Sequence, residues 1–124
     1  LLILAFGAVS INSQNKDFKQ KKTPEERAQK MSDKMSKELS LTSDQQSKVY
    51  DIFLSQAQQA DQIRSSTADK TSRRSQMKSL FESTDIQLQA VLNSEQLQKY
   101  NDWKAKMKEK QKNKKNRKSN KQNQ

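Results

Sequence analysis

The chain has 124 residues, of which 30% are hydrophobic and 31% charged, and its formal net charge is +11. That length suits one small domain or a helical element with tails. The sequence contains no Cys and no His, which excludes thiolate and imidazole metal sites, cysteine nucleophiles and catalytic triads built on histidine. Its single glycine, Gly7, lies in an apolar run, so glycine-rich phosphate-binding loops are excluded as well. We therefore expect no enzyme activity, no metal and no cofactor.

Residues 1–13 predict a secretory signal peptide. An uncharged apolar run over residues 1–9 is followed by small and polar residues, as in the hydrophobic region and cleavage zone of such leaders. Neither a Met nor a basic segment precedes Leu1, so we expect the start of the leader to be missing. The polar, Lys-rich residues 14–22 predict a linker. The protein is therefore expected to be periplasmic. If the leader stays uncleaved, it would instead anchor the protein in the membrane. The remaining interpretation of the apolar run is a buried strand or the start of a helix.

Residues 23–26, Thr-Pro-Glu-Glu, predict the start of a first helix. Thr23 suits the N-cap, Pro24 suits position N1, where no N–H partner is needed, and Glu26 at N3 completes a capping box. The apolar residues that follow step by 3, 4 and 4 and form one helical stripe, Ala28, Met31, Met35 and Leu39.

A corner at residues 41–45, Leu-Thr-Ser-Asp-Gln, predicts the start of a second helix. Thr42 suits the N-cap and Gln45 is its N3 partner, while Asp44 favours the positive end of the helix dipole. The apolar stripe of this helix is Val49, Ile52, Phe53, Ala57, Ala60 and Ile63. The hydroxyl side chains of residues 65–67 compete for backbone hydrogen bonds and predict its end.

A third helix is predicted from about Asp69 to Val91, and a second corner at residues 92–96, Leu-Asn-Ser-Glu-Gln, predicts the start of a fourth. Here Asn93 suits the N-cap and Gln96 is its N3 partner. The stripe of the third helix is Met77, Phe81, Thr84, Leu88 and Val91, flanked by Leu80 and Ile86. That of the fourth is Leu97, Tyr100, Trp103 and Met107. No apolar residue follows Met107, so residues 108–124 are predicted to be a disordered Lys-rich tail.

These elements predict an all-α fold of about four helices over residues 23–107. The two corners lie 51 residues apart, which indicates two antiparallel, hairpin-like units in an elongated molecule. Large apolar residues are few for a domain of this length. We therefore expect a homodimer that shares its apolar stripes, or else a marginal, flexible monomer.

The paired corners resemble the Leu-Thr-x-x-Gln motifs of the Spy/CpxP-type periplasmic chaperone family. The first corner matches in full, while the second has Asn93 in place of Thr and Ser94 where Pro is frequent. The resemblance covers about residues 24–107 and implies long, bent helical dimers whose concave face holds unfolding proteins without ATP. Some relatives bind zinc, a role for which this chain lacks His and Cys ligands. The resemblance implies structural roles in the helix corners for Leu41, Thr42, Gln45, Leu92, Asn93 and Gln96.

A protein that holds unfolding chains benefits from adaptable methionine side chains beside mixed charge. The candidate client-binding residues are Met31, Met35, Arg73, Arg74 and Met77. The alternative interpretation is that the methionines fill the core and that the arginines are solvated surface charges.

The expected function is therefore that of an exported, ATP-independent chaperone-like protein that holds unfolding clients or takes part in the envelope stress response. The alternative is a polyanion-binding or partner-binding helical adaptor acting through the basic tail. This tail contains seven Lys and Arg117, and its single acidic residue is Glu109. Such a tail would also make weak contact with a membrane surface. It has no aromatic residue to stack on bases, so no specific nucleic-acid binding is expected. The third interpretation, an enzyme, would depend on helical surface carboxylates such as Asp44, Glu82 or Glu95.

Overall fold

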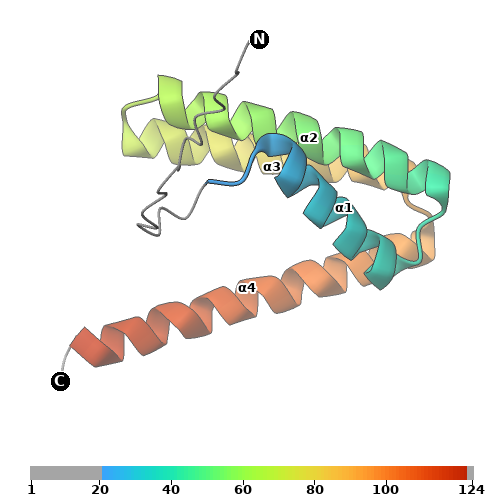
Figure 1. Ribbon diagram of the computed structural model, residues 1–124. Coiled ribbons are helices and arrows are strands. Elements are labelled where there is room, and N and C mark those ends of the chain that lie inside the picture. The colour runs from blue at the N-terminus through green and yellow to red at the C-terminus, as the bar shows by residue number, and fades with distance from the viewer. Residues whose placement is uncertain (1–20, 123–124) are drawn as a thin grey trace, which may run out of the picture.

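The computed structural model describes residues 21–122, and within them the chain forms four α-helices and no strand (Figure 1). The predicted signal peptide and most of the predicted linker lie outside the described residues. The helices are α1 (Pro24–Leu39), α2 (Ser43–Ser66), α3 (Lys70–Val91) and α4 (Ser94–Gln122). The all-α prediction is confirmed.

Local chemistry places the helix starts where the sequence predicts them. Thr23 and Thr42 each close a full capping box, with Glu26 and Gln45 as the respective N3 partners. At α4, the side chain of Asn93 accepts the N–H of Gln96 at 2.8 Å and the Gln96 side chain accepts the N–H of Asn93 at 3.1 Å. These bonds satisfy amides that a helix N-terminus otherwise leaves without partners.

The two corners meet in space through their glutamines. Nε2 of Gln45 donates to Oε1 of Gln96 at 2.8 Å, and Nε2 of Gln96 donates to Oε1 of Gln45 at 3.0 Å. Gln45 also donates to the carbonyl of Val91 at 3.1 Å, and Gln96 to the carbonyl of Leu39 at 3.4 Å. Each of the two glutamines therefore also donates a hydrogen bond to the last residue of the helix that precedes the other corner.

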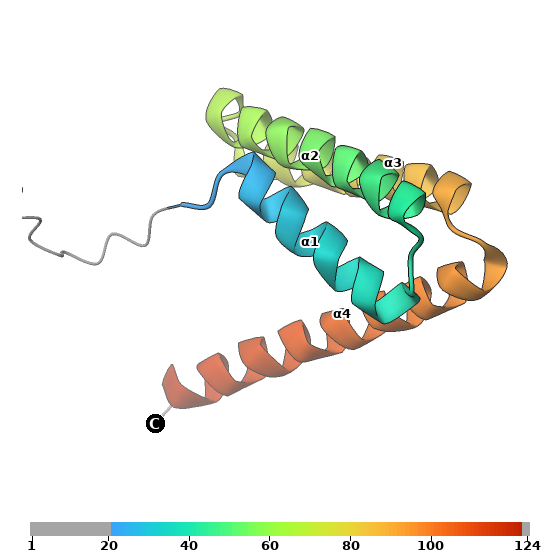
Figure 2. The same ribbon diagram turned by 45° about the vertical axis from the view of Figure 1, so that its right-hand side comes forward.

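The two pairs of helices joined by the corners, α1–α2 and α3–α4, differ in how closely their helices pack. α2 and α3 lie side by side and antiparallel, and α1 packs along α2 and also contacts α4 (Figure 1). α4 departs from α3 at the second corner and diverges from the α2–α3 pair toward its C-terminal end (Figure 2). The first corner-joined pair, α1 and α2, thus pack on each other at an angle, whereas the second pair, α3 and α4, diverge as an open V (Figure 2).

The core lies where α1, α2 and the corner ends of α3 and α4 come together. Its buried residues are Ala28, Met35, Leu39, Val49, Phe53, Leu88, Leu92 and Tyr100. The predicted stripes of α1 and α2 supply most of these residues, as the sequence indicated. Two buried hydroxyl groups are satisfied within their own helices, because Ser32 donates to the carbonyl of Gln29 and Thr84 to that of Leu80.

On α3 the buried stripe differs from the prediction. Leu80, Thr84 and Leu88 are buried, whereas Phe81 is 48% exposed. Successive helical residues point about 100° apart, so a helix cannot turn both Leu80 and Phe81 toward the same neighbour. Packing against α2 selects Leu80.

The prediction that residues 108–124 form a disordered tail is wrong for residues 108–122. α4 continues without interruption to Gln122, and every residue from 108 to 122 is exposed. Lys, Arg and Gln are good helix formers, and no Gly or Pro in this stretch ends the helix. The lack of apolar residues correctly predicted that this stretch is not buried, but burial is not required for a helix extended from a packed one.

Candidate functional site: a basic groove with an apolar floor

Two adjoining hollows lie between the helices, and we call them together the inner groove. The first, of about 820 Å³, is lined by α2, α3 and α4, and the second, of about 450 Å³, is lined by residues of all four helices and by Lys22. The residues common to both hollows are Phe53, Gln56, Arg64, Met77 and Phe81. The first hollow is lined by residues of both α3 and α4, the two helices that diverge as an open V in Figure 2.

The floor of the inner groove is apolar. Phe53 and Phe81 lie at the junction of the two hollows, and Met31, Met77 and Met107 line their sides. Phe81 is one of two large hydrophobic side chains that are exposed in the described part of the chain; the other, Ile86, lies on α3 outside the groove. An exposed aromatic ring beside flexible thioethers is a surface that can fit apolar side chains of different shapes.

The rim of the groove is strongly basic. In the first hollow, α3 contributes Lys70, Arg73, Arg74 and Lys78, and α4 contributes Lys108 from the opposite side. None of these five side chains forms an ion pair with another described residue. Like charges therefore face one another across the V, which raises the local positive potential.

Asp85, one of the two acidic residues that line the described groove, is paired with two residues of α4. The hydroxyl of Tyr100 donates to its Oδ1 at 2.6 Å, and Nζ of Lys104 lies 2.7 Å from its Oδ2 and 4.8 Å from the centre of the Tyr100 ring. Burial of the ring, with the hydrogen bond to Asp85 and its charge, raises the pKa of Tyr100 far above its usual range. This cluster joins α3 to α4 and holds the V at its closed end.

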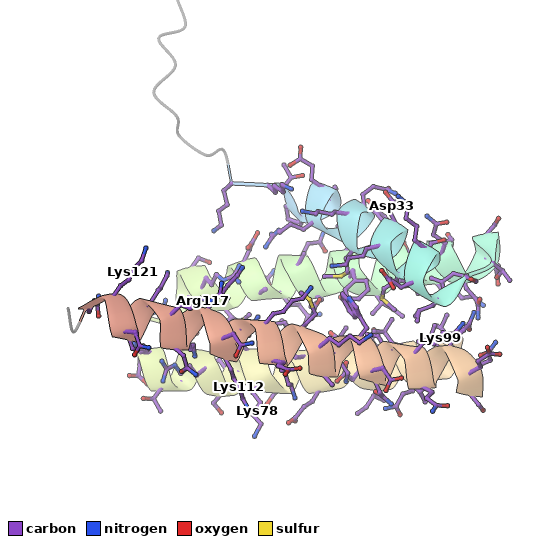
Figure 3. All side chains as sticks on the ribbon, turned by 90° about the horizontal axis from the view of Figure 1, so that it is seen from below. Asp33, Lys78, Lys99, Lys112, Arg117 and Lys121 are labelled. Carbon is purple, nitrogen blue, oxygen red and sulfur yellow. The ribbon has the colours of Figure 1, made fainter. Side chains whose placement is uncertain are left out.

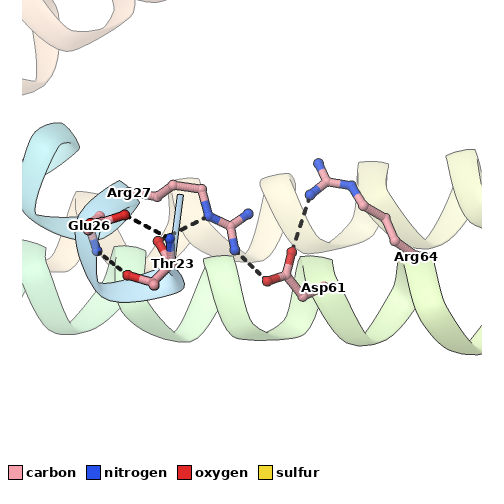
Figure 4. Close-up of polar contacts among 5 residues, drawn as sticks. All are labelled: Thr23, Glu26, Arg27, Asp61 and Arg64. Atoms are coloured by element: carbon pink, nitrogen blue, oxygen red, sulfur yellow. Dashed lines mark hydrogen bonds and ion pairs between the residues drawn. The ribbon is translucent and has the colours of Figure 1, made fainter. Parts of the chain in front are cut away.

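A second polar cluster joins α1 to α2 at the edge of the groove (Figure 4). Arg27 donates from Nη2 to Asp61, and Nε of Arg27 donates to the carbonyl of Thr23 at 3.4 Å. Arg64, one turn further along α2, lies 3.4 Å from the other carboxylate oxygen of Asp61. The hydrogen bond from Arg27 lowers the pKa of Asp61. The cluster attaches the start of α1 to the end of α2.

The structure brings four of the five predicted client-binding residues to the inner groove. Arg73 and Arg74 line the first hollow, Met31 the second, and Met77 both. Met35 is different: it is 1% exposed and fills the core beneath α1, so it has no surface to offer a client in this fold. Met35 therefore fills the core, whereas Met31 and Met77 line the inner groove.

The sequence analysis did not predict that Phe81 and two lysines of α4 line the inner groove. Phe81 was assigned to the core stripe, and Lys104 was not singled out, yet both line the groove. The adjacent pair Leu80 and Phe81 carried a weak signal, because neighbouring helical residues point about 100° apart and seldom bury equally. No sequence signal indicated that Lys104 and Lys108 line the groove, because their position depends on the angle at which α4 leaves the second corner.

The described residues place no group of three or more His, Cys, Asp or Glu side chains close enough to hold a metal ion. None of the four helices of residues 21–122 has an apolar stretch long enough to cross a membrane.

Comparison with known proteins gives one family. A model of a family described as a domain of unknown function, DUF4890, matches residues 12–100, which include α1, α2, α3 and the first turns of α4. No curated protein and no solved structure matches the chain. The match takes in both corners and most residues of the groove, and it ends before the basic half of α4. Since it covers more than two thirds of the sequence, the chain belongs to the DUF4890 family.

Proposed function

We propose that this protein is an exported, ATP-independent chaperone-like protein that holds apolar segments of unfolding clients in the inner groove, as part of an envelope stress response. The observation that carries the proposal is the exposed ring of Phe81 on an apolar floor with a rim of cationic side chains. The leader-like sequence of residues 1–13 and the paired corners support the location and the class of protein.

The floor supplies affinity for non-native chains. Burying apolar surface is favourable by about 25 cal/mol per Å², and Met31, Met77 and Met107 can adjust their rotamers to unlike partners. Such binding has no single required side-chain geometry, so it suits clients of many sequences.

The rim supplies attraction over longer distances. Lys70, Arg73 and Arg74 lie along one wall of the groove and Lys108 on the other. A positive cleft of this kind speeds encounter with acidic segments, and the effect weakens as salt concentration rises. The proposal needs no nucleotide, because release follows when the client buries its own apolar segment.

The oligomeric state and the periplasmic location belong to the same proposal. The predicted homodimer would place two inner grooves on one particle and increase avidity for a long client. Sedimentation equilibrium of the exported chain measures the first point, and cell fractionation measures the second.

The test compares two exposed residues of α3 that differ in their relation to the groove. Phe81→Ser removes the ring from the groove floor, whereas Ile86→Ser removes an even more exposed apolar side chain, 67% exposed, that lies outside the groove. We expect wild type and Ile86→Ser to suppress the aggregation of a chemically denatured client at stoichiometric amounts. Phe81→Ser should need several-fold more protein for the same suppression.

Circular dichroism of both variants verifies that the helices remain folded. If wild type fails to suppress aggregation at about tenfold excess over client, the proposed function is wrong. If both serine variants lose activity equally, the protein acts through general surface hydrophobicity, and the groove is not the site.

A further inference from the structure

The C-terminal half of α4 is a helix that carries unbalanced positive charge. Residues 108–122 contain seven Lys and Arg117 against Glu109, and all fifteen residues are exposed. None of these cations forms an ion pair with another described residue. Fixing these charges on a helix therefore gives a rod of high positive potential beyond the core.

The cations of this rod lie in rows. Helical periodicity places one row on one face, with steps of 4, 4, 3 and 4 residues: Lys106, Lys110, Lys114, Arg117 and Lys121. At 1.5 Å per residue this row, which we call the outer row, extends for about 22 Å, with cations about 5–6 Å apart along the axis. Figure 3 shows Arg117 and Lys121 projecting from one side of α4 and Lys112 from the other.

The opposite row begins at the groove. Lys104 and Lys108 line the first hollow, and Lys112 and Lys115 continue their row with steps of 4 and 3 residues. A strip that carries Glu109, Asn113, Asn116 and Asn120 separates the two rows on one side of the helix, and Lys118 lies between them on the other side. Two opposed rows present charge to a partner that can follow the helix, whereas a flat surface meets only one of them.

Like charges one turn apart destabilise a helix, and the outer row contains such pairs at Lys106–Lys110, Lys110–Lys114 and Arg117–Lys121. No described acidic side chain forms an ion pair with these cations. A chain of anions spaced along the row would do so and would release the counterions held by both partners.

We infer that the C-terminal half of α4 binds a linear anionic polysaccharide bearing sulfate or phosphate groups, and that binding stabilises this half of the helix. A bilayer fits less well, because no apolar residue follows Met107 to enter the acyl region. A single-stranded nucleic acid also fits less well, because this half of the helix has no aromatic side chain on which a base could stack. The site lies on a different surface from the groove floor and does not depend on the proposed function.

The experiment uses heparin as the probe and the full chain with two charge-matched variants. The row variant carries Lys110→Gln, Lys114→Gln, Arg117→Gln and Lys121→Gln. The control variant loses the same charge at exposed lysines outside both the inner groove and the outer row, with Lys21→Gln, Lys37→Gln, Lys48→Gln and Lys99→Gln. Binding is measured by fluorescence titration across a series of salt concentrations.

For wild type and the control variant we expect steep salt dependence. Each contact with a single anionic strand contributes about 0.7 to the slope of log K against log salt, so loss of four contacts should lower the slope by about 3 in the row variant. Heparin should also raise the helical circular dichroism signal at elevated temperature in wild type and in the control, but not in the row variant.

Three results would overturn the inference. One is an equal loss of heparin affinity in the control variant, which would mean that net charge alone decides binding. Another is stronger binding to vesicles of anionic phospholipid than to heparin, which would assign the rod to a membrane. The last is stronger binding to single-stranded DNA than to heparin at the same salt concentration, which would assign it to nucleic acid.

Discussion

Gln45 and Gln96, which are 51 residues apart, hold the two corners together by exchanging amide hydrogen bonds of 2.8 and 3.0 Å. Each glutamine also completes the capping box of its own helix, so one side chain serves local and tertiary structure at once. The pair joins the start of α2 to the start of α4, and Gln96 also joins α4 to the end of α1. Its removal should therefore affect the whole fold.

Replacement of Gln96 by Ala should lower the free energy of unfolding by about 2–4 kcal/mol. Gln96 is 7% exposed, and its loss removes the hydrogen bonds that its side chain forms with the Leu39 carbonyl, the Asn93 N–H and the Gln45 amide, which keeps its bond to the Val91 carbonyl. Urea unfolding followed by circular dichroism measures the loss. Gln98→Ala, on the exposed face of the same helix, is the matched control and should change stability little.

A double-mutant cycle with Gln45→Ala and Gln96→Ala should give a coupling energy of about 1–3 kcal/mol, because the two side chains are direct partners. Additive losses, within about 0.5 kcal/mol, would show that the corners are stabilised independently.

Replacement of Ser40 by Gly should raise stability by about 0.5–1 kcal/mol. Ser40 ends α1 in the left-handed region, with φ 52° and ψ 55°, which costs a residue with a Cβ about 1–2 kcal/mol. The greater freedom of glycine in the unfolded chain offsets part of that gain. Ser47→Gly, in the interior of α2, should instead lower stability. A thermal melt of the two variants against wild type distinguishes the signs, and destabilisation by Ser40→Gly would contradict the cap geometry.

Tyr100 should make the protein lose stability above pH 10. Its pKa is raised in the folded state, so above about pH 10 the unfolded chain releases a proton that the folded chain keeps. The free energy of unfolding then falls by up to about 1.4 kcal/mol per pH unit. Tyr100→Phe should lack this contribution, and Tyr50→Phe should retain it. Urea midpoints between pH 9 and 11.5 measure the difference, and parallel curves for the two variants would contradict it.

The Arg27–Asp61 contact should contribute stability near neutral pH and lose it in acid. The pKa of Asp61 is lowered in the folded state, chiefly by the hydrogen bond from Arg27. Its contribution is therefore complete above the unfolded value of about 3.9 and disappears as pH falls through the lower folded value. Asp61→Asn should be less stable than wild type at pH 6 and equal to it at the acid end of the titration. Asp51→Asn, which changes an exposed carboxylate of α2 outside the described ion pairs, is the matched control.

The sequence by itself determined the helices and their starts. Thr23, Thr42 and Asn93 were predicted as N-caps and are observed in that role, because a cap needs only a partner three residues away. The stripes of α1 and α2 were predicted for the same reason, since a helix with one apolar face has one face to bury.

Tertiary structure decided what lies between the helices. Whether Leu80 or Phe81 is buried depends on the rotation of α3 against α2, and whether Lys108 faces Arg73 depends on the direction in which α4 leaves the second corner. That direction depends on contacts between residues far apart in the sequence, those of Gln45 with Gln96 and those of Asp85 with Tyr100 and Lys104. Local rules reach about one helical turn, so they fixed the elements and left the groove, with its apolar floor and basic rim, to the packing of the whole chain.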